Sequence, residues 1–197
     1  NKVSLELPVI ASPMDTISEA AMAVSVGVYG GAAIVHRYNT IQEQADIITL
    51  AKNIAMDNHN TDIVVGAAIG VTDDYLNRAA VMSALGVDFL CVDVAHGHHI
   101  LMKDALRRLR NAFGDELHIM AGNIATLEGI NDLADWGADS VRCNIGGGSI
   151  CSTRIETGHG VAGLQTVLDC AKTDRDVTII ADGGIRNSGD MVKALAA

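Results

Sequence analysis

Short apolar runs recur along the chain, and each one ends in a cluster of polar residues or glycines. These runs predict β-strands, because they are short and rich in Val, Ile, Leu and Ala. Their near-continuous apolar character is typical of parallel strands that are covered on both faces. The seven predicted strands are residues 7–11, 32–36, 63–69, 89–93, 118–122, 140–145 and 177–182.

Segments with helical periodicity lie between the predicted strands. Thr40 and Glu43 form a capping-box pattern, which predicts that a helix begins there. Further helix ends are predicted by the N-cap candidates Thr72, Thr126 and Ser188 and by the terminating glycines Gly86 and Gly137. Strands that alternate with helices in this way predict a parallel α/β sheet.

An open doubly wound sheet and a (β/α)8 barrel both have this alternation, and the placement of polar residues distinguishes them. Polar or glycine clusters follow almost every predicted strand, at residues 12–15, 36–39, 93–97, 122–123, 146–151 and 182–184. In a barrel all of these loops converge on one face, whereas an open sheet uses only those near its switch point. We therefore predict a (β/α)8 TIM barrel, with residues 1–197 as a single, incomplete catalytic domain. The eighth strand is missing after the seventh strand and its helix, so we expect a longer natural chain.

Composition narrows the class of partner. The chain is 49% hydrophobic and 3% aromatic, which suits a core of small aliphatic residues, and its net charge is −10. That charge disfavours nucleic acid, which needs a basic face. No apolar run reaches the roughly 18 residues of a membrane span, and no signal peptide is recognisable. The four cysteines lack metal-type pair spacing. We expect a reduced, cytoplasmic location and no membrane partner.

The most informative motif is the glycine loop (residues 146–151), which follows a predicted strand. Three glycines allow a sharp turn and close approach to a ligand, and exposed backbone N–H groups followed by Ser149 suit a phosphate. Cys151 lies where a nucleophile would stand, and oriented backbone dipoles with Arg154 can lower the pKa of its thiol. The alternative is a flexible glycine loop with a buried cysteine.

Other reactive side chains have structural interpretations. His96, His98 and His99 follow the fourth predicted strand, and imidazole suits zinc, yet no partner at a typical spacing is identifiable. We interpret them as a loop rather than a metal site. His36 is expected to pack or to form a hydrogen bond near the barrel rim. The remaining cysteines are expected to be inert core residues: Cys91, Cys143 and Cys170.

Taken together, the motifs resemble the IMP dehydrogenase / GMP reductase family in order and over essentially the whole chain. The segments that carry the resemblance are residues 8–16, 30–36, 65–70, 93–98, 120–123, 146–154, 157–160 and 181–186. The resemblance implies a TIM barrel that acts on a purine nucleotide (GMP or IMP) with NADPH or NAD as cofactor. It also implies a homotetramer.

The resemblance further implies roles for individual residues. Cys151 would attack carbon 2 of the purine to form a covalent intermediate, and Thr153 would assist proton transfer. The nucleotide would be held by Ser12, Met14, Ser149, Asp182, Gly183 and Gly184, of which Asp182 would accept bonds from the ribose hydroxyls. The cofactor would face Asp93, Asn123 and Arg142, and a potassium ion would bind main-chain carbonyls of Gly146, Gly148 and Cys151.

Several departures from the family pattern bear on the reaction. The family usually has glycine where Asn144 stands, and that residue adds bulk on the expected cofactor side. Dehydrogenases usually carry CBS modules after the second strand–helix unit, and this chain has no room for such an insert. We therefore favour a GMP reductase, which converts GMP and NADPH to IMP, ammonia and NADP. The alternatives are an IMP dehydrogenase (IMP, NAD and water to XMP and NADH), a non-catalytic purine-nucleotide-binding homologue, and a generic phosphate-binding barrel.

Overall fold

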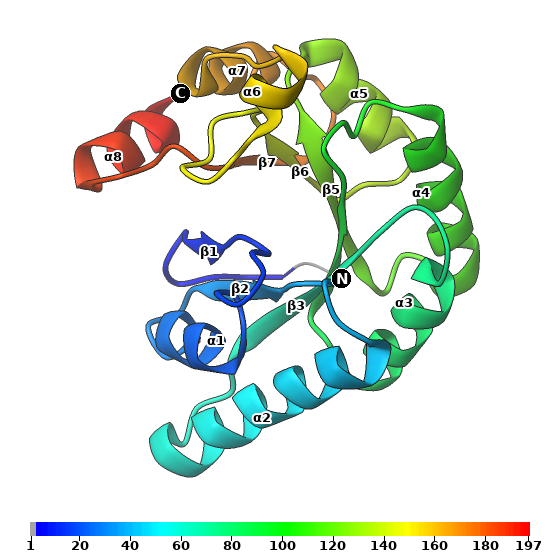
Figure 1. The fold of residues 1–197 in the computed structure, drawn as a ribbon, viewed down its shortest axis with the longest axis vertical. Coiled ribbons are helices and arrows are strands. Elements are labelled where there is room, and N and C mark those ends of the chain that lie inside the picture. Colours follow the sequence, from blue (N-terminus) through cyan, green and yellow to red (C-terminus); the bar gives the residue numbers. More distant parts are fainter. Residues whose placement is uncertain (1–2) are drawn as a thin grey trace. The chain divides into compact units, whose positions relative to one another are not determined.

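The computed structural model describes residues 3–197, and within them seven strands alternate with helices (Figure 1). The strands are β1 (Ile10–Ala11), β2 (Ala32–Val35), β3 (Val64–Ile69), β4 (Phe89–Asp93), β5 (His118–Ile124), β6 (Ser140–Cys143) and β7 (Thr178–Ala181). The helices are α1 (Ala20–Gly27), α2 (Ile41–His59), α3 (Tyr75–Ala84), α4 (Ile100–Phe113), α5 (Leu127–Asp135), α6 (Thr153–Thr157), α7 (Gly163–Cys170) and α8 (Ser188–Ala196). All seven predicted strands are confirmed, although β1 is shorter than expected and β5 is longer.

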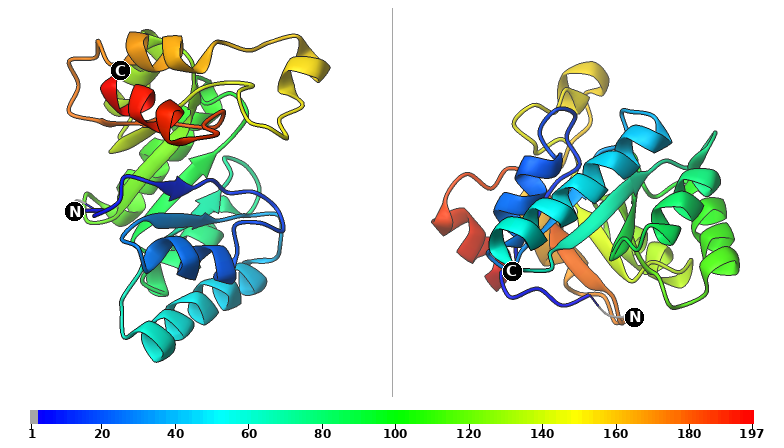
Figure 2. Two further views of the ribbon diagram at one scale, coloured as in Figure 1. Left: turned by 90° about the vertical axis from the view of Figure 1, so that its left-hand side faces the viewer. Right: turned by 90° about the horizontal axis from the view of Figure 1, so that it is seen from below.

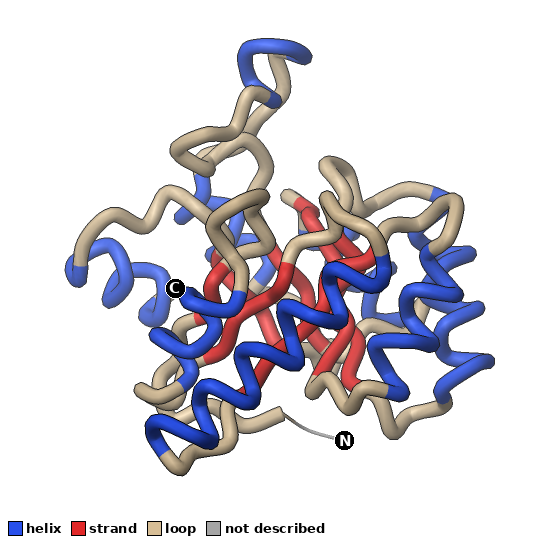
Figure 3. The backbone as a smooth tube through the Cα atoms, turned by 60° about the horizontal axis from the view of Figure 1, so that its bottom comes forward, coloured by secondary structure: helices blue, strands red, loops and turns tan. Residues whose placement is uncertain are grey.

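The chain forms two compact units. Unit 1 contains the residues up to Val92 together with Leu109–His118, and unit 2 contains Asp93–Arg108 and Ile119–Ala197. In unit 1, β1, β2, β3 and β4 pair in parallel in that order, and in unit 2 the order is β5, β6, β7. Figure 3 shows the strands in red with the helices in blue beside them.

Small aliphatic side chains fill the core of unit 1. Every residue of β2 is buried, and so is β3 from Val65 onward. Gly66 has a steric role, because a Cβ there would collide with the Phe89 ring on the neighbouring strand. Buried residues of α1, α2 and α3 pack against this sheet. The packing therefore fixes the carboxyl ends of β2 and β3, where the next loops begin.

Unit 2 has a smaller core around β6. All four residues of β6 are buried, and α5 contributes Ile130 and Leu133. Cys143 on β6 and Cys170 on α7 are both buried in unit 2, and Cys91 on β4 is buried in unit 1. The prediction that these three cysteines belong to the core is confirmed.

Helix ends agree with the sequence pattern at most positions. The capping box of Thr40 and Glu43 is present at α2, and the Thr126 side chain caps α5. Gly86 and Gly137 follow the ends of α3 and α5 with positive φ angles. The Thr72 prediction was wrong, because α3 begins after Asp74 and the Thr72 hydroxyl donates to Asp73 instead.

The Ser188 prediction was also wrong, by one residue. The Asn187 side chain accepts from the Asp190 amide and caps α8, which places Ser188 in the first turn. Among the helices of residues 3–197, none combines the length and the apolar content that crossing a bilayer requires.

Candidate functional site

In unit 2, a buried guanidinium links two carboxylates, one at the end of β4 and one just after β7. Arg142 on β6 is 5% exposed. Its Nη1 lies 2.5 Å from Oδ1 of Asp93 at the end of β4, and its Nη2 lies 2.9 Å from Oδ2 of Asp182 just after β7. Arg142 therefore pairs with two largely buried carboxylates and holds both at the carboxyl ends of the strands.

Asp182 has a second donor on β5. Asn123 Nδ2 donates to Asp182 Oδ2 at 2.6 Å and to the Asn144 carbonyl at 3.0 Å. The Asp182 backbone amide also donates to the Cys143 carbonyl at 3.0 Å. Asp182 is thus fixed through its carboxylate and its main chain, while its side chain stays 16% exposed. A carboxylate held in this way can accept hydrogen bonds from a pair of hydroxyl groups.

The glycine loop lies directly against the turn that follows Asp182. A Cβ on Gly183 would stand 3.1 Å from the Gly148 backbone, and one on Gly184 would stand 3.1 Å from the Gly147 carbonyl. Gly183 and Gly184 both have a φ of +74°. Only glycine suits such a φ and such an approach, so two glycine segments that are far apart in sequence meet here. Ser149 is exposed at the same loop.

Cys151 ends this loop and is only partly buried. Its Sγ lies 3.2 Å from Thr153 Oγ1. The hydroxyl and amide of Thr153, followed by the positive charge of Arg154 and the amide of Gly146, lower the pKa of the Cys151 thiol. By contrast, contact with Cys170 and burial raise the pKa of the Cys143 thiol. Cys151 is therefore the cysteine in this unit that combines exposure with stabilisation of its thiolate.

Arg154 has a structural role that the sequence did not reveal. Its Nη2 donates to the Val161 carbonyl at 2.8 Å, and its side-chain stem fills the space beside Gly146 and Gly160. Arg154 therefore holds Gly146 and Val161, the two ends of the segment that carries Cys151, close together. Figure 2 shows this segment and α6, in yellow, extending from the rest of unit 2.

The predicted nucleotide residues Ser12 and Met14 belong to unit 1, in the loop after β1. The Ser12 carbonyl accepts from the Ser18 hydroxyl, and the Met14 carbonyl accepts from the amides of Ile17 and Ser18 at 3.2 and 2.9 Å. Both residues are half-buried. The structure thus brings together the other predicted site residues in unit 2 and presents Ser12 and Met14 on a hydrogen-bonded loop of unit 1.

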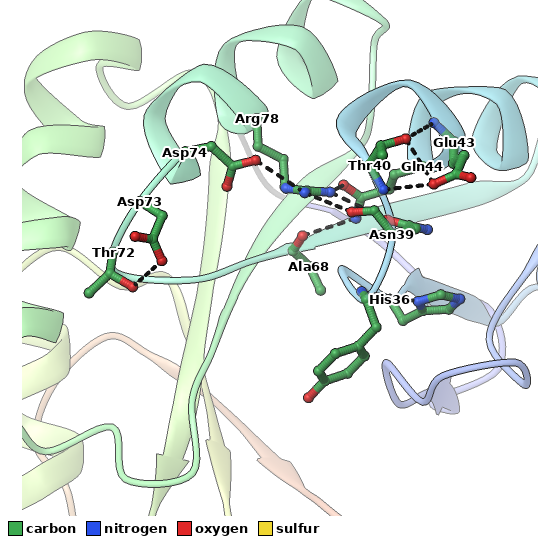
Figure 4. Close-up of polar contacts among 11 residues, drawn as sticks. His36, Asn39, Thr40, Glu43, Gln44, Ala68, Thr72, Asp73, Asp74 and Arg78 are labelled. Carbon is green, nitrogen blue, oxygen red and sulfur yellow. Dashed lines mark hydrogen bonds and ion pairs between the residues drawn. The ribbon is translucent and has the colours of Figure 1, made fainter.

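Unit 1 contains a polar cluster of its own, centred on Arg78, which was not predicted from the sequence (Figure 4). The Arg78 guanidinium donates to Gln44 Oε1 at 3.0 Å and to the Asn39 carbonyl at 2.9 Å, and it pairs with Asp74 at 3.2 Å. Gln44 in turn donates to the Ala68 carbonyl at 2.9 Å. This cluster joins the loops after β2 and β3, and its residues showed no motif because they come from separate elements.

His36 and His98 have structural contacts. His36 is buried and its Nε2 lies 3.1 Å from Glu19 Oε1, so the prediction that it packs or forms a hydrogen bond is confirmed. His98 Nε2 lies 2.8 Å from Asp132 Oδ2, and its ring packs near Trp136. Across residues 3–197, no three His, Cys, Asp or Glu side chains are grouped so that they could hold a metal ion.

The predicted potassium ligands are main-chain carbonyls of the glycine loop. The Gly148 carbonyl already accepts from the Cys151 amide at 3.2 Å. Hard cations take about six to eight oxygen ligands, so the carbonyls of Gly146, Gly148 and Cys151 do not make a complete site. These carbonyls would supply only part of the ligands of a potassium ion, and other groups would have to supply the rest.

Comparison with known proteins identifies the family. A model of the IMP dehydrogenase / GMP reductase domain matches residues 1–197, and the chain belongs to this family. A solved structure of inosine 5′-monophosphate dehydrogenase from Legionella pneumophila is 44% identical and has a TM-score of 0.88 over 99% of this chain and 56% of the other. This match confirms the predicted fold class, an incomplete (β/α)8 barrel.

Curated relatives carry both enzyme names. The chain is 39% identical to inosine-5′-monophosphate dehydrogenase of Bacillus subtilis over 195 residues, which cover 96% of this chain and 40% of the relative. It is 44% identical to GMP reductase of Leishmania donovani over 159 residues, which cover 78% of this chain and 32% of the relative. The chain therefore spans less than half the length of these two relatives.

Proposed function

We propose that the chain supplies the nucleotide-binding catalytic part of a purine nucleotide oxidoreductase. The observation that carries this proposal is the Cys151 thiol, whose pKa is lowered at the end of a glycine loop packed against the Asp182–Gly184 turn. A nucleophile, backbone amides that suit a phosphate and a carboxylate that suits a ribose stand within one unit. Ser149, Gly183 and Gly184 would hold the phosphate.

Within this class we propose a GMP reductase. Attack of Cys151 Sγ on C2 of GMP would form a C–S bond, and loss of the 2-amino group as ammonia would leave a covalent nucleotide adduct. NADPH, when bound, supplies the hydride that replaces sulfur at C2 and releases IMP and the thiolate. The Thr153 hydroxyl, next to Sγ, would donate to the thiolate and help to transfer the proton that the amino group needs to leave.

The residues proposed to face the cofactor are compatible with this role. Asp93 keeps 19% of its side chain exposed although it is paired with Arg142, so it can still accept a bond from a carboxamide. Arg142 and Asn123 are engaged with Asp182, and they would act by holding the carboxylates in place. The direct connection of α2 to β3, with no inserted module, supports the reductase.

The second candidate is an IMP dehydrogenase, which the Legionella structure favours. In that reaction Cys151 would add to C2 of IMP, the C2 hydrogen would leave as hydride to NAD, and water would cleave the adduct to XMP. Both reactions pass through the same nucleotide–Cys151 adduct.

The two reactions are distinguished by absorbance of the reduced cofactor. The full-length natural protein would be incubated with GMP plus NADPH and, separately, with IMP plus NAD, each with a Cys151→Ala variant as control. With GMP we expect the unmodified protein to lose NADPH absorbance over time. The Cys151→Ala variant should show no such loss. A gain of absorbance with IMP would replace the reductase by the dehydrogenase. Nucleotide binding without turnover in either assay would indicate a non-catalytic homologue.

A further inference from the structure

Asn144 occupies a backbone conformation that favours glycine. It follows β6 directly and has a φ of +128°, although it carries a side chain that is almost completely buried. A residue with a Cβ is strained at this φ. The position therefore keeps an amide side chain where glycine would fit the backbone better.

The Asn144 amide ties β6 to the segment after β7. Its Nδ2 donates to the Asp182 carbonyl at 2.8 Å, while its own carbonyl accepts from Asn123 at 3.0 Å. The Asp182 amide donates to the Cys143 carbonyl. The main chain of Asp182 is thus bonded on both sides to consecutive residues at the end of β6.

The same amide also supports the glycine loop. A Cβ on Gly147 would collide with the Asn144 amide, and one on Gly163 at the start of α7 would lie 2.9 Å from Asn144 Nδ2. Asn144 Oδ1 is buried and has no hydrogen-bond partner among the described residues. A buried oxygen without a partner is unfavourable for folding. The cost of burying this oxygen offsets part of the stability that the Nδ2 bond to Asp182 contributes.

We infer that Asn144 is a positioning residue for the nucleotide site, holding the Asp182 backbone and the glycine loop in the arrangement that the nucleotide meets. This inference rests on the proposed function, because it assigns nucleotide contacts to Asp182, Gly183 and the loop. Asn144 acts through these groups and does not itself contact the reacting atoms. A site that is ordered before binding loses less entropy when the ligand arrives.

The test replaces Asn144 by glycine, which suits the φ and removes the amide. The matched control is Asn60→Gly, because Asn60 also has a positive φ of +49° but lies exposed at the end of α2. Hydrogen exchange of the amides of residues 182–184 is measured without ligand, with those of β5 as an internal reference. The dissociation constants of GMP and IMP are measured by calorimetry on the full-length protein.

For Asn144→Gly we expect exchange at residues 182–184 to accelerate about five- to tenfold, with β5 unchanged, and the nucleotide Kd to rise by a similar factor. Asn60→Gly should change neither. Unchanged exchange at residues 182–184, or an unchanged Kd, in Asn144→Gly would overturn the inference. If the unmodified protein bound neither nucleotide, the proposed function would fail, and the site role of Asn144 would fail with it. Faster hydrogen exchange at residues 182–184 would then show only that the Asn144 side chain holds the Asp182 backbone.

Discussion

At the scale of single residues, the reactivity of Cys151 depends on donors that stabilise a negative sulfur. The Thr153 hydroxyl and amide are the main donors, and Arg154 and the Gly146 amide add to them. Each of these groups favours the thiolate over the thiol and therefore lowers the pKa. The thiolate fraction near neutral pH is consequently higher than for an ordinary exposed cysteine, whose pKa is about 8.5.

Removal of the Thr153 hydroxyl should raise the pKa of Cys151. The rate of alkylation by iodoacetamide follows the thiolate fraction, so in Thr153→Val the midpoint of the rate-against-pH curve should move upward. Peptide mapping assigns the alkylated residue. Ser152→Ala is the matched control, since Ser152 is adjacent and its side chain does not cap α6. Coincident curves for Thr153→Val and the unmodified protein would contradict this account of the pKa.

Breaking the buried Arg142 pairs should cost far more unfolding free energy than breaking an exposed arginine–aspartate pair. Arg142→Met leaves Asp93 and Asp182 without their counter-ion in a mostly buried place, which should cost about 3 kcal/mol of unfolding free energy. Arg175→Met breaks a bidentate but exposed pair with Asp135, worth about 0–1 kcal/mol. Chemical denaturation of both variants measures the difference, and equal losses would refute it.

The residues of the site differ in how far the sequence could identify them. Cys151 and Gly183 stand in local motifs, so the pattern was enough to select them. The pairing of Arg142 with Asp93 and Asp182 depends on where three strands end, which no local pattern encodes. The contacts of Arg154 with Gly146 and Gly160 likewise depend on how a loop folds back on itself.

At the scale of elements, the hydrophobic pattern was sufficient to locate every strand, because each strand is a short apolar run bounded by turn residues, and β2 to β6 are mostly buried. Helix starts were less predictable. Thr72 and Asn187 show the reason: several neighbouring polar side chains can cap, and the tertiary path of the loop selects one. The capping box of α2 was predictable because two residues specify it together.

Loss of this capping box should destabilise unit 1. Thr40→Ala removes the acceptor for the Glu43 amide and a donor to the Glu43 carboxylate, at a cost of about 1 kcal/mol. Thr49→Ala is the matched control, because the Thr49 hydroxyl only donates to the Ala45 carbonyl within α2. That substitution should change stability by less than about 0.5 kcal/mol. If a urea titration gave Thr40→Ala and Thr49→Ala the same loss of unfolding free energy, the capping box would have no stabilising effect beyond that of an ordinary helix hydroxyl.

At the scale of the whole molecule, the resemblance to the family leads us to predict a homotetramer for the full-length protein. Light scattering at micromolar concentration measures the mass directly, and a tetramer is the expected result. A monomer would contradict the prediction. This outcome does not affect the chemistry proposed for Cys151, which depends on groups within unit 2.

The central claim is that Cys151 forms a covalent bond to the purine during turnover, and mass spectrometry of acid-quenched full-length protein tests it most directly. The protein would be quenched within milliseconds of mixing with GMP or with IMP plus NAD, and then digested. We expect the Cys151 peptide to gain the mass of GMP less ammonia, or equally of IMP less two hydrogens, and Cys151→Ala to show no adduct. Turnover by the Cys151→Ala protein, or an adduct on another residue, would contradict the account.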